Sequence, residues 1–154
     1  MAKKYDIPSF LQGSISQYVY ERWLRRKAQA HVKRDRNRGN SSAIGETYRD
    51  AIHAAVQECN GADAYTGEPL EWELLSKYDN VSSEELGRAY KHQFARLPTV
   101  DHIGDGKGAP EFKICSWRTN DAKHDLSMTG FTELCIAVLK HQGFSVTKFP
   151  SPND

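Results

Sequence analysis

The sequence has few cysteines, no long apolar run and almost no net charge. Its three cysteines, Cys59, Cys115 and Cys135, are widely spaced and include no C-x-x-C pair, which excludes a disulfide framework and a cysteine-built zinc knuckle. All three are predicted to be small buried hydrophobic residues. "CIAVL", the longest core-like apolar run near the C-terminus, is too short to cross a bilayer, and "MAKKYD" lacks the apolar stretch of a signal peptide. We expect a cytoplasmic protein that does not enter a membrane.

The length and composition are those of one globular domain with a substantial core. The chain has 154 residues, of which 38% are hydrophobic and 27% charged, as in soluble folded proteins. The net charge of +1 conceals an uneven distribution, because eight of the seventeen residues from 22 to 38 are Arg or Lys and Asp35 is the single acid among them. This run predicts contact with a polyanion. The alternative is a solvated helix face.

Hydrophobic periodicity predicts mostly helices in the first two thirds of the chain. The second helix places its apolar residues on one stripe, and the third begins with a capping box formed by Ser82 and Glu85. The expected helices run from Ser14 or Ser16 to about Arg36, over about 44–58 with the stripe Ile44, Tyr48, Ile52, Ala55 and Val56, and over about 83–94.

Beyond Pro98 the pattern changes to short runs rich in β-branched and aromatic residues. "TVDHI" and "EFKICSW" flank "GDGKGAP", which predicts an antiparallel hairpin around a glycine-rich loop. "NDAKHDL" returns to a helical pattern, and "GFTELCIAVLKHQG" predicts an amphipathic helix with the stripe Phe131, Leu134, Cys135, Val138 and Leu139. We therefore expect an α+β fold with a basic helical region (1–60), a core that contains the hairpin (61–145) and a tail (146–154).

The hairpin places an acid beside an imidazole. Asp101 and His102 point to opposite faces of a strand and can serve different partners. If the following helix starts over the end of this strand, Asn120 lies in its first turn and His124 on the same helix face. Asp101 and Asn120 can then bind a divalent cation through oxygen, with His124 as a further ligand, while His102 stays free. Such a set suits phosphodiester hydrolysis, with His102 taking a proton from water.

These residues resemble the HNH, or ββα-metal, endonuclease family. "VDH" at 100–102 and "SWRTNDAK" at 116–123 are similar to the strand motif and the helix start of that family. The resemblance covers roughly residues 96–126 and implies a two-stranded antiparallel hairpin plus helix. It also implies that Asp101 and Asn120 are metal ligands and that His102 is the general base. The expected cofactor is one divalent metal ion, first Mg²⁺, with Mn²⁺, Ni²⁺ and Zn²⁺ as alternatives.

The sequence departs from the family pattern in two ways. No Asn lies between the VDH motif and Asn120, so Asn120 is either the last ligand, the register that we prefer, or the middle residue with His124 last. The cysteine knuckle that braces the hairpin in many relatives is also absent. "YTGEPL" at 65–70 takes the place of its first loop, and Trp72, Trp117 and the flanking helices are expected to give the support.

Positive side chains and glycines complete the predicted nucleic-acid site. The glycine-rich loop is expected to let a nucleic-acid backbone approach, and cations on the first helix and near the hairpin to contact phosphate. These cations are Lys107, Lys113, Arg118, Lys123, Arg25, Arg26, Lys33 and Arg34. The favoured function is a metal-dependent HNH-type endonuclease acting on DNA. The alternatives are a non-catalytic nucleic-acid-binding protein with the same fold and a cysteine hydrolase that uses Cys115 with His102 and Asp101.

Overall fold

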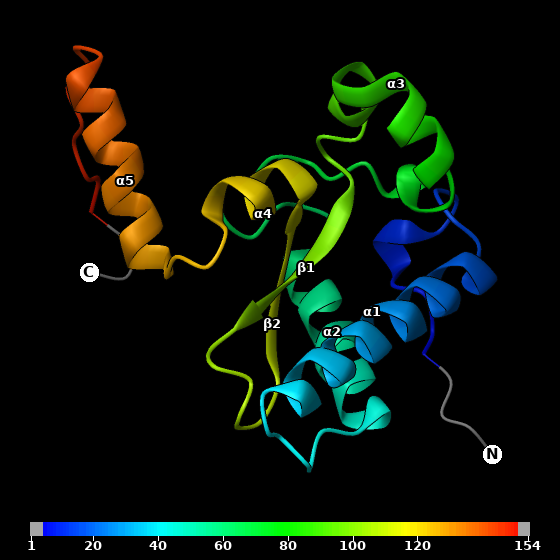
Figure 1. Ribbon diagram of the computed structural model, residues 1–154. Helices are drawn as coiled ribbons and strands as arrows, with labels where there is room; N and C mark the ends of the chain where they lie inside the picture. The colour runs from blue at the N-terminus through cyan, green and yellow to red at the C-terminus, as the bar shows by residue number, and fades with distance from the viewer. Residues whose placement is uncertain (1–4, 151–154) are drawn as a thin grey trace. The chain divides into compact units, whose positions relative to one another are not determined.

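The first long helix begins and ends close to its predicted bounds. The computed structural model describes residues 5–150 (Figure 1). A short 3₁₀ helix, η1 (Ser9–Leu11), precedes α1 (Gln17–Asn37). The hydroxyl of Ser16 caps α1 by accepting a hydrogen bond from Val19 N. The buried residues of α1 recur every three or four positions and form one face: Tyr20, Trp23, Leu24, Ala28, His31, Val32 and Asp35.

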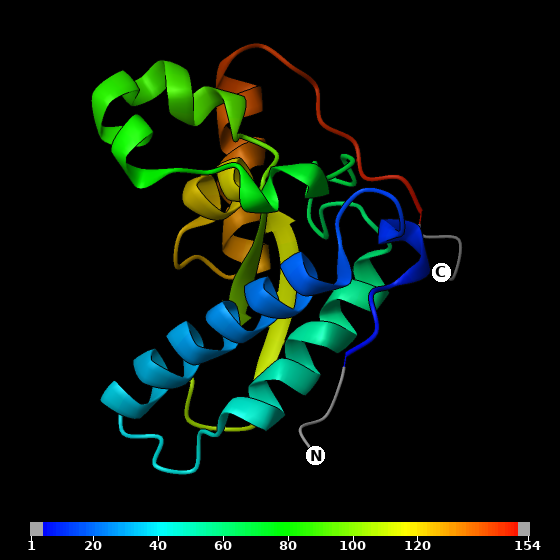
Figure 2. The ribbon, with the colours of Figure 1, turned by 90° about the vertical axis from the view of Figure 1, so that its right-hand side faces the viewer.

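The second helix packs against the first. α2 spans Gly45–Cys59, and Figures 1 and 2 show it beside α1 and along the hairpin. Ile44 is exposed, contrary to the predicted stripe, because it is the N-cap and precedes the first turn. The rest of that stripe is buried as predicted: Tyr48, Ile52, Ala55 and Val56.

The predicted hairpin is present. β1 (Pro98–Ile103) and β2 (Glu111–Ser116) are antiparallel neighbours, and the register pairs Asp101 with Lys113 and His102 with Phe112. Val100, Phe112 and Ile114 belong to the same buried cluster as the apolar faces of α1 and α2. The basic helical region and the hairpin therefore share one hydrophobic core.

The helix between α2 and the hairpin starts earlier than predicted. It follows a 3₁₀ helix, η2 (Trp72–Ser76), and α3 spans Asn80–Gln93. The N-cap is Asp79, whose carboxylate accepts hydrogen bonds from both the amide and the hydroxyl of Ser82. The predicted capping box is therefore wrong, because Ser82 lies inside the helix. Gly87, with φ 58°, interrupts the helix in its middle.

The fourth helix begins directly after β2. α4 spans Trp117–Lys123, so Trp117 starts the helix and does not continue the strand as predicted. Its amide donates to Leu97 O at 2.9 Å, and that of Arg118 to Ala95 O at 3.0 Å. These bonds attach the start of α4 to the segment that leads into β1.

The chain forms two compact units, residues 1–120 and 121–154. α5 (Met128–His141) belongs to the second, and none of its residues is buried. Of the predicted tail (146–154), residues 151–154 lie outside the described part of the chain.

The cysteines differ in exposure. Cys115 is buried as predicted, Cys59 is half-buried and Cys135 is exposed. The prediction that all three are buried is therefore wrong for Cys135, which lies on a helix without buried residues. None of the helices described between residues 5 and 150 has the length and apolar character needed to cross a membrane.

Candidate functional site

Asp101 and His102 lie on opposite faces of β1. His102 shares its face with Phe112, whose ring centroid lies 5.0 Å from that of the imidazole. Asp101 shares the other face with Lys113. The imidazole is only 4% exposed. His102 therefore points into the fold, toward the two long helices.

His102 is bonded to Asp35 of α1. Its Nε2 lies 2.7 Å from Asp35 Oδ2, and the Tyr48 hydroxyl of α2 donates to the same oxygen. Burial by itself would raise the pKa of Asp35, but the hydrogen bonds from Tyr48 and His102 and nearby positive charge lower it overall. An ionised carboxylate only accepts, so Nε2 carries the proton and donates it. The prediction that His102 stays free is wrong, because one of its nitrogens is bonded to Asp35.

The other atoms of this pair are buried without a hydrogen bond. Neither His102 Nδ1 nor Asp35 Oδ1 has a partner among the residues that the structure describes. The closest ion-pair partner of Oδ1 is Arg34, whose Nε lies 4.0 Å away, beyond hydrogen-bond range. Buried polar atoms are normally satisfied, so these two atoms are exceptions inside the fold.

A second imidazole lies beside the first. The rings of His31 and His102 are 5.7 Å apart, and His31 Nδ1 lies 3.0 Å from Arg34 Nη2. A guanidinium only donates, so Nδ1 accepts and His31 is neutral. Burial, reinforced by the charge of Arg34, lowers the pKa of His31 to about 3.

The glycine-rich loop approaches Asp35. Gly106 is buried with φ 78°, and a Cβ at this position would lie 2.4 Å from Asp35 Oδ1. The carbonyl of Gly106 also accepts a hydrogen bond from Asn40 Nδ2 at 2.8 Å. The expectation that the loop leaves room for a nucleic-acid backbone is wrong at Gly106, because that space holds the Asp35 carboxylate.

The opposite face of β1 carries a second set of polar contacts. The Tyr65 hydroxyl donates to Asp101 Oδ2, and burial together with Asp101 raises the pKa of Tyr65, so the phenol stays protonated. Two residues earlier on the strand, Thr99 Oγ1 accepts from Lys27 Nζ at 3.1 Å. Burial lowers the pKa of Lys27 to about 8.

The two predicted ligands beyond the hairpin are placed differently. Asn120 is half-buried and lies on α4, four positions into the helix. His124 follows the end of α4 with φ 51°, a left-handed conformation that ends the helix. The expectation that it lies on the helix face of Asn120 is therefore wrong. Its exposed ring pairs with Asp125, with Nδ1 3.1 Å from Oδ1.

The donor set suits a hard cation. Asp101 offers a carboxylate oxygen and Asn120 an amide oxygen, the ligand types that Mg²⁺ prefers. Mg²⁺ is commonly held by one or two such protein groups together with water and phosphate. Among residues 5–150 there is no group of three or more His, Cys, Asp or Glu side chains that could hold a metal ion. Two oxygen donors fit Mg²⁺ better than Zn²⁺, which takes three or four protein ligands.

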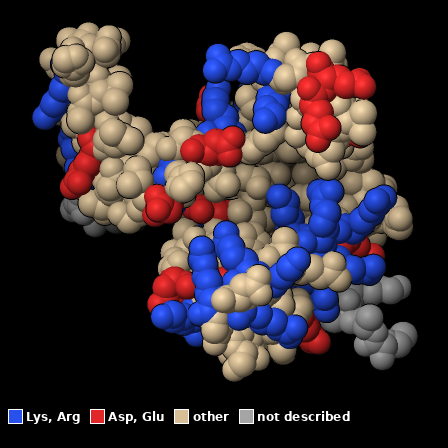
Figure 3. Space-filling model, viewed as in Figure 1, with Lys and Arg blue, Asp and Glu red and all other residues tan. Residues whose placement is uncertain are grey.

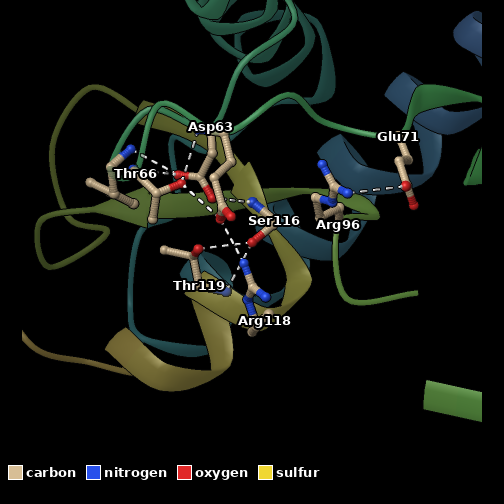
Figure 4. Close-up of polar contacts among 9 residues, drawn as sticks. Asp63, Thr66, Glu71, Arg96, Ser116, Arg118 and Thr119 are labelled. Atoms are coloured by element: carbon tan, nitrogen blue, oxygen red, sulfur yellow. Dashed lines mark hydrogen bonds and ion pairs between the residues drawn. The ribbon is translucent and has the colours of Figure 1, made fainter. Parts of the chain in front are cut away.

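A network centred on Asp63 braces the base of the hairpin (Figure 4). Asp63 accepts backbone hydrogen bonds from Tyr65 at 2.8 Å, Thr66 at 3.2 Å and Ser116 at 2.9 Å. Ser116 Oγ in turn bonds the hydroxyl and the amide of Thr119. Burial by itself would raise the pKa of Asp63, but these hydrogen bonds lower it overall. The network joins the turn after α2 to the end of β2.

Of the two tryptophans expected to brace the hairpin, Trp72 lies in the core cluster that includes Val100 and Ile114 of the hairpin. Trp72 packs in the core against Trp23, and Trp117 packs edge-on against Tyr78. The turn after α2 is joined to β2 by the hydrogen bond from Ser116 N to Asp63 and by the backbone bond from Ala64 N to Ile114 O. The sequence did not identify this role of Asp63.

The predicted phosphate-binding cations differ in their availability. Figure 3 shows Lys and Arg side chains gathered over α1, where Arg25, Arg26 and Lys33 are exposed. Arg34 is half-buried and contacts His31. A phosphate group can therefore reach the first three without breaking an interaction of the core.

The cations near the hairpin differ in their exposure and in their ion-pair partners. Lys107 is exposed on the glycine-rich loop. Lys113 pairs with Glu58 at 3.0 Å, and Arg118 with Glu68 at 2.6 Å. Lys123 is buried.

Cys115 and His102 lie on opposite faces of the hairpin. Cys115 pairs with Thr99 in the register and so shares the face of Asp101, whereas His102 points to the other face.

Sequence reasoning did not select Asp35 as a site residue. Asp35 follows Ala28, His31 and Val32 with the spacing of the buried face of α1. A carboxylate on a buried stripe requires a partner, and this is the signal that could have identified it. The partner, His102, is 67 positions away in the sequence, and no local pattern points to it.

Comparison with known proteins adds no relative. No family model, no curated protein and no solved structure matches this chain.

Proposed function

We propose that this protein is a metal-dependent, HNH-type endonuclease that hydrolyses DNA. The observation that carries the proposal is the order of three elements: β1 and β2 form a hairpin, and α4 follows β2 directly. β1 contains Asp101 and His102, and α4 contains Asn120. This order supports the proposal, because the HNH resemblance implies a hairpin followed by a helix. An Asp-His dipeptide alone is a weak signal, whereas the same pair on a hairpin followed by an Asn-bearing helix is a specific one.

In the proposed reaction, a water oxygen attacks phosphorus while the bond from phosphorus to the leaving sugar oxygen breaks. His102 takes the proton of the attacking water. Asp101 and Asn120 would hold the divalent cation through oxygen. When bound, the cation polarises the phosphate and stabilises the negative charge of the leaving oxygen.

The decisive experiment measures nicking of supercoiled plasmid with Mg²⁺, Mn²⁺ or Ni²⁺, beside an EDTA control. We expect metal-dependent nicking that is lost in His102→Ala and retained in His92→Ala, a matched change at an exposed histidine of α3. Asp101→Ala and Asn120→Ala should raise the metal concentration needed for half-maximal rate. Nicking by His102→Ala at the wild-type rate would contradict the role of His102.

The exposed cations of α1 supply affinity for the DNA backbone in this proposal. Removing one cation that neutralises a phosphate reduces the slope of log K against log salt by about 0.9. Substituting Arg25, Arg26 and Lys33 together with Gln should therefore reduce that slope by about 2 to 3. A control with equal charge change replaces three exposed cations in and just before α3: Lys77, Arg88 and Lys91. Equal slopes for both triple variants would mean that the cations of α1 form a solvated helix face and do not bind the DNA backbone.

A second candidate function is nucleic-acid binding without catalysis on the same fold. The observation that favours it is the burial of His102, whose side chain is 4% exposed and bonded through Nε2 to Asp35. This function predicts salt-sensitive DNA binding that EDTA does not change and no cleavage with any of the three metals. The plasmid assay therefore separates the two functions.

A further inference from the structure

The groups around the bond between Asp35 and His102 come from three elements that sequence reasoning did not connect. Asp35 lies on α1, Tyr48 on α2 and Gly106 in the loop that follows β1. Asp35 Oδ2 accepts hydrogen bonds from both His102 Nε2 and the Tyr48 hydroxyl. The side chains of Asp35 and His102 are 0% and 4% exposed. This carboxylate is therefore held away from water, where its charge acts most strongly on the imidazole.

We infer that Asp35 is the positioning residue of this site: it fixes His102 through Nε2 and leaves Nδ1 as the proton acceptor. This inference rests on the proposed function for its catalytic meaning. The carboxylate selects one tautomer because it accepts and cannot donate. A buried carboxylate holds the ring orientation and the tautomer of a general base, and it stabilises the imidazolium that forms when the base takes a proton.

The described groups around Asp35 and His102 offer no hydrogen-bond partner for a proton on His102 Nδ1. The Tyr48 hydroxyl donates to the same carboxylate oxygen, and burial together with Asp35 raises the pKa of Tyr48 to about 12, so it remains a donor. Arg34 is committed to His31, whose neutral ring stands beside His102 without a hydrogen bond to it. Asp35 is thus the one described hydrogen-bond partner of the His102 ring.

Gly106 also helps to hold the Asp35 carboxylate in place. A Cβ at this position would lie 2.4 Å from Asp35 Oδ1 and 2.8 Å from its carboxyl carbon. The loop backbone therefore closes over the carboxylate and restricts its rotation. The chain holds both partners of the bond in place, Asp35 by this loop and by Tyr48, and His102 by the hairpin.

The tautomer of His102 tests the inference without any activity measurement. We would record imidazole ¹⁵N spectra of the full chain over a series of pH values, read the tautomer of the neutral ring at the upper end of the series, and assign His102 by its loss in His102→Ala. The expected spectrum has the proton on Nε2 in the wild type and in Tyr48→Phe, and a mixture of tautomers in Asp35→Asn, because an amide both donates and accepts. A proton on Nδ1 in the wild type, or an unchanged spectrum in Asp35→Asn, would overturn the inference.

Plasmid nicking then tests the catalytic meaning. In Asp35→Asn we expect the rate to fall by about 100-fold with plasmid affinity unchanged, and in Asp6→Asn, the same change at an exposed position, to stay at the wild-type level. If His102-dependent nicking is present but Asp35→Asn cuts at the wild-type rate, the positioning role is wrong and the nuclease stands. If the wild type fails to cut whichever metal is added, the proposed function fails, while the spectra still decide whether Asp35 orients His102.

Discussion

Two carboxylates are buried against the hairpin, and they are satisfied in different ways. Asp63 accepts hydrogen bonds from three backbone amides through both oxygens. Asp35 accepts from two side chains through one oxygen, and its other oxygen has no hydrogen bond among the described residues. Backbone donors are placed by the fold, whereas side-chain donors are free to take part in chemistry. This difference is the basis of our inference that Asp35 positions its neighbour, and it assigns a structural role to Asp63.

The largest effect is expected at Asp63. Asp63→Ala leaves three backbone amides at the base of the hairpin without their acceptor, one in a buried and two in partly buried hydrogen bonds. A buried unsatisfied donor costs about 1 to 3 kcal/mol. We expect the free energy of unfolding to fall by roughly 3 to 5 kcal/mol, measured by urea denaturation. Asp6→Ala, at an exposed position, serves as the control. A loss of unfolding free energy below about 1 kcal/mol in Asp63→Ala would contradict the structural role of Asp63.

Two glycines of the glycine-rich loop test whether this loop holds Asp35 in place. Gly104 and Gly106 both have positive φ, 86° and 78°, but only at Gly106 would a Cβ meet Asp35. Gly104→Ala should therefore cost about 1 kcal/mol for the left-handed backbone, and Gly106→Ala about 2 kcal/mol more because the Asp35 carboxylate must move. Equal losses of unfolding free energy in the two variants would mean that the loop does not hold Asp35.

Acid should lower the stability contributed by the two ends of the hairpin in different pH ranges. Near Asp35, the pKa of His31 in the folded state is about 3, against about 6.5 in an unfolded chain. The unfolded state binds more protons between these values, so stability falls as the pH falls below about 6.5, by up to about 1.4 kcal/mol per pH unit. Asp63 has a lowered pKa, so its contribution is present above about pH 4 and is lost as the pH falls through the lower folded value.

Urea denaturation between about pH 7.5 and 4.5 checks this order. His31→Phe should flatten the decline of unfolding free energy over that range by up to about 2 kcal/mol at pH 5. His92→Phe, on the exposed face of α3, should retain the wild-type slope. If His31→Phe also retains it, the buried neutral state of His31 is wrong.

The smallest effect is expected at the rim of the Asp63 network. Arg118 and Glu68 form an ion pair at 2.6 Å, visible in part in Figure 4, but both side chains are exposed, 56% and 45%. Exposed pairs contribute about 0 to 1 kcal/mol. Arg118→Gln should therefore change the free energy of unfolding by about 0.5 kcal/mol or less, and by less still at high salt. A loss as large as that of Asp63→Ala would place the ion pair, and not the carboxylate, at the centre of the brace.

Local patterns predicted the elements better than their ends. The helix after Ser16 and the strands on either side of "GDGKGAP" follow from periodicity and turn residues, and both are present. The predicted start of α3 was wrong because both Asp79 and Ser82 are residue types that favour the N-cap position. Only the hydrogen bond from the Ser82 amide to Asp79 decides between them. His124 was misplaced because a left-handed residue ends α4.

Residues close together in the chain account for the α+β elements, the cationic face of α1 and the adjacency of Asp101 and His102, so each of these could be predicted from the sequence. The bond from Asp35 to His102 and the closure of Gly106 over the carboxylate became visible only in the folded chain. These contacts join α1, α2 and the hairpin across 67 positions. They depend on how two helices pack on a sheet, which the period of an apolar stripe does not specify.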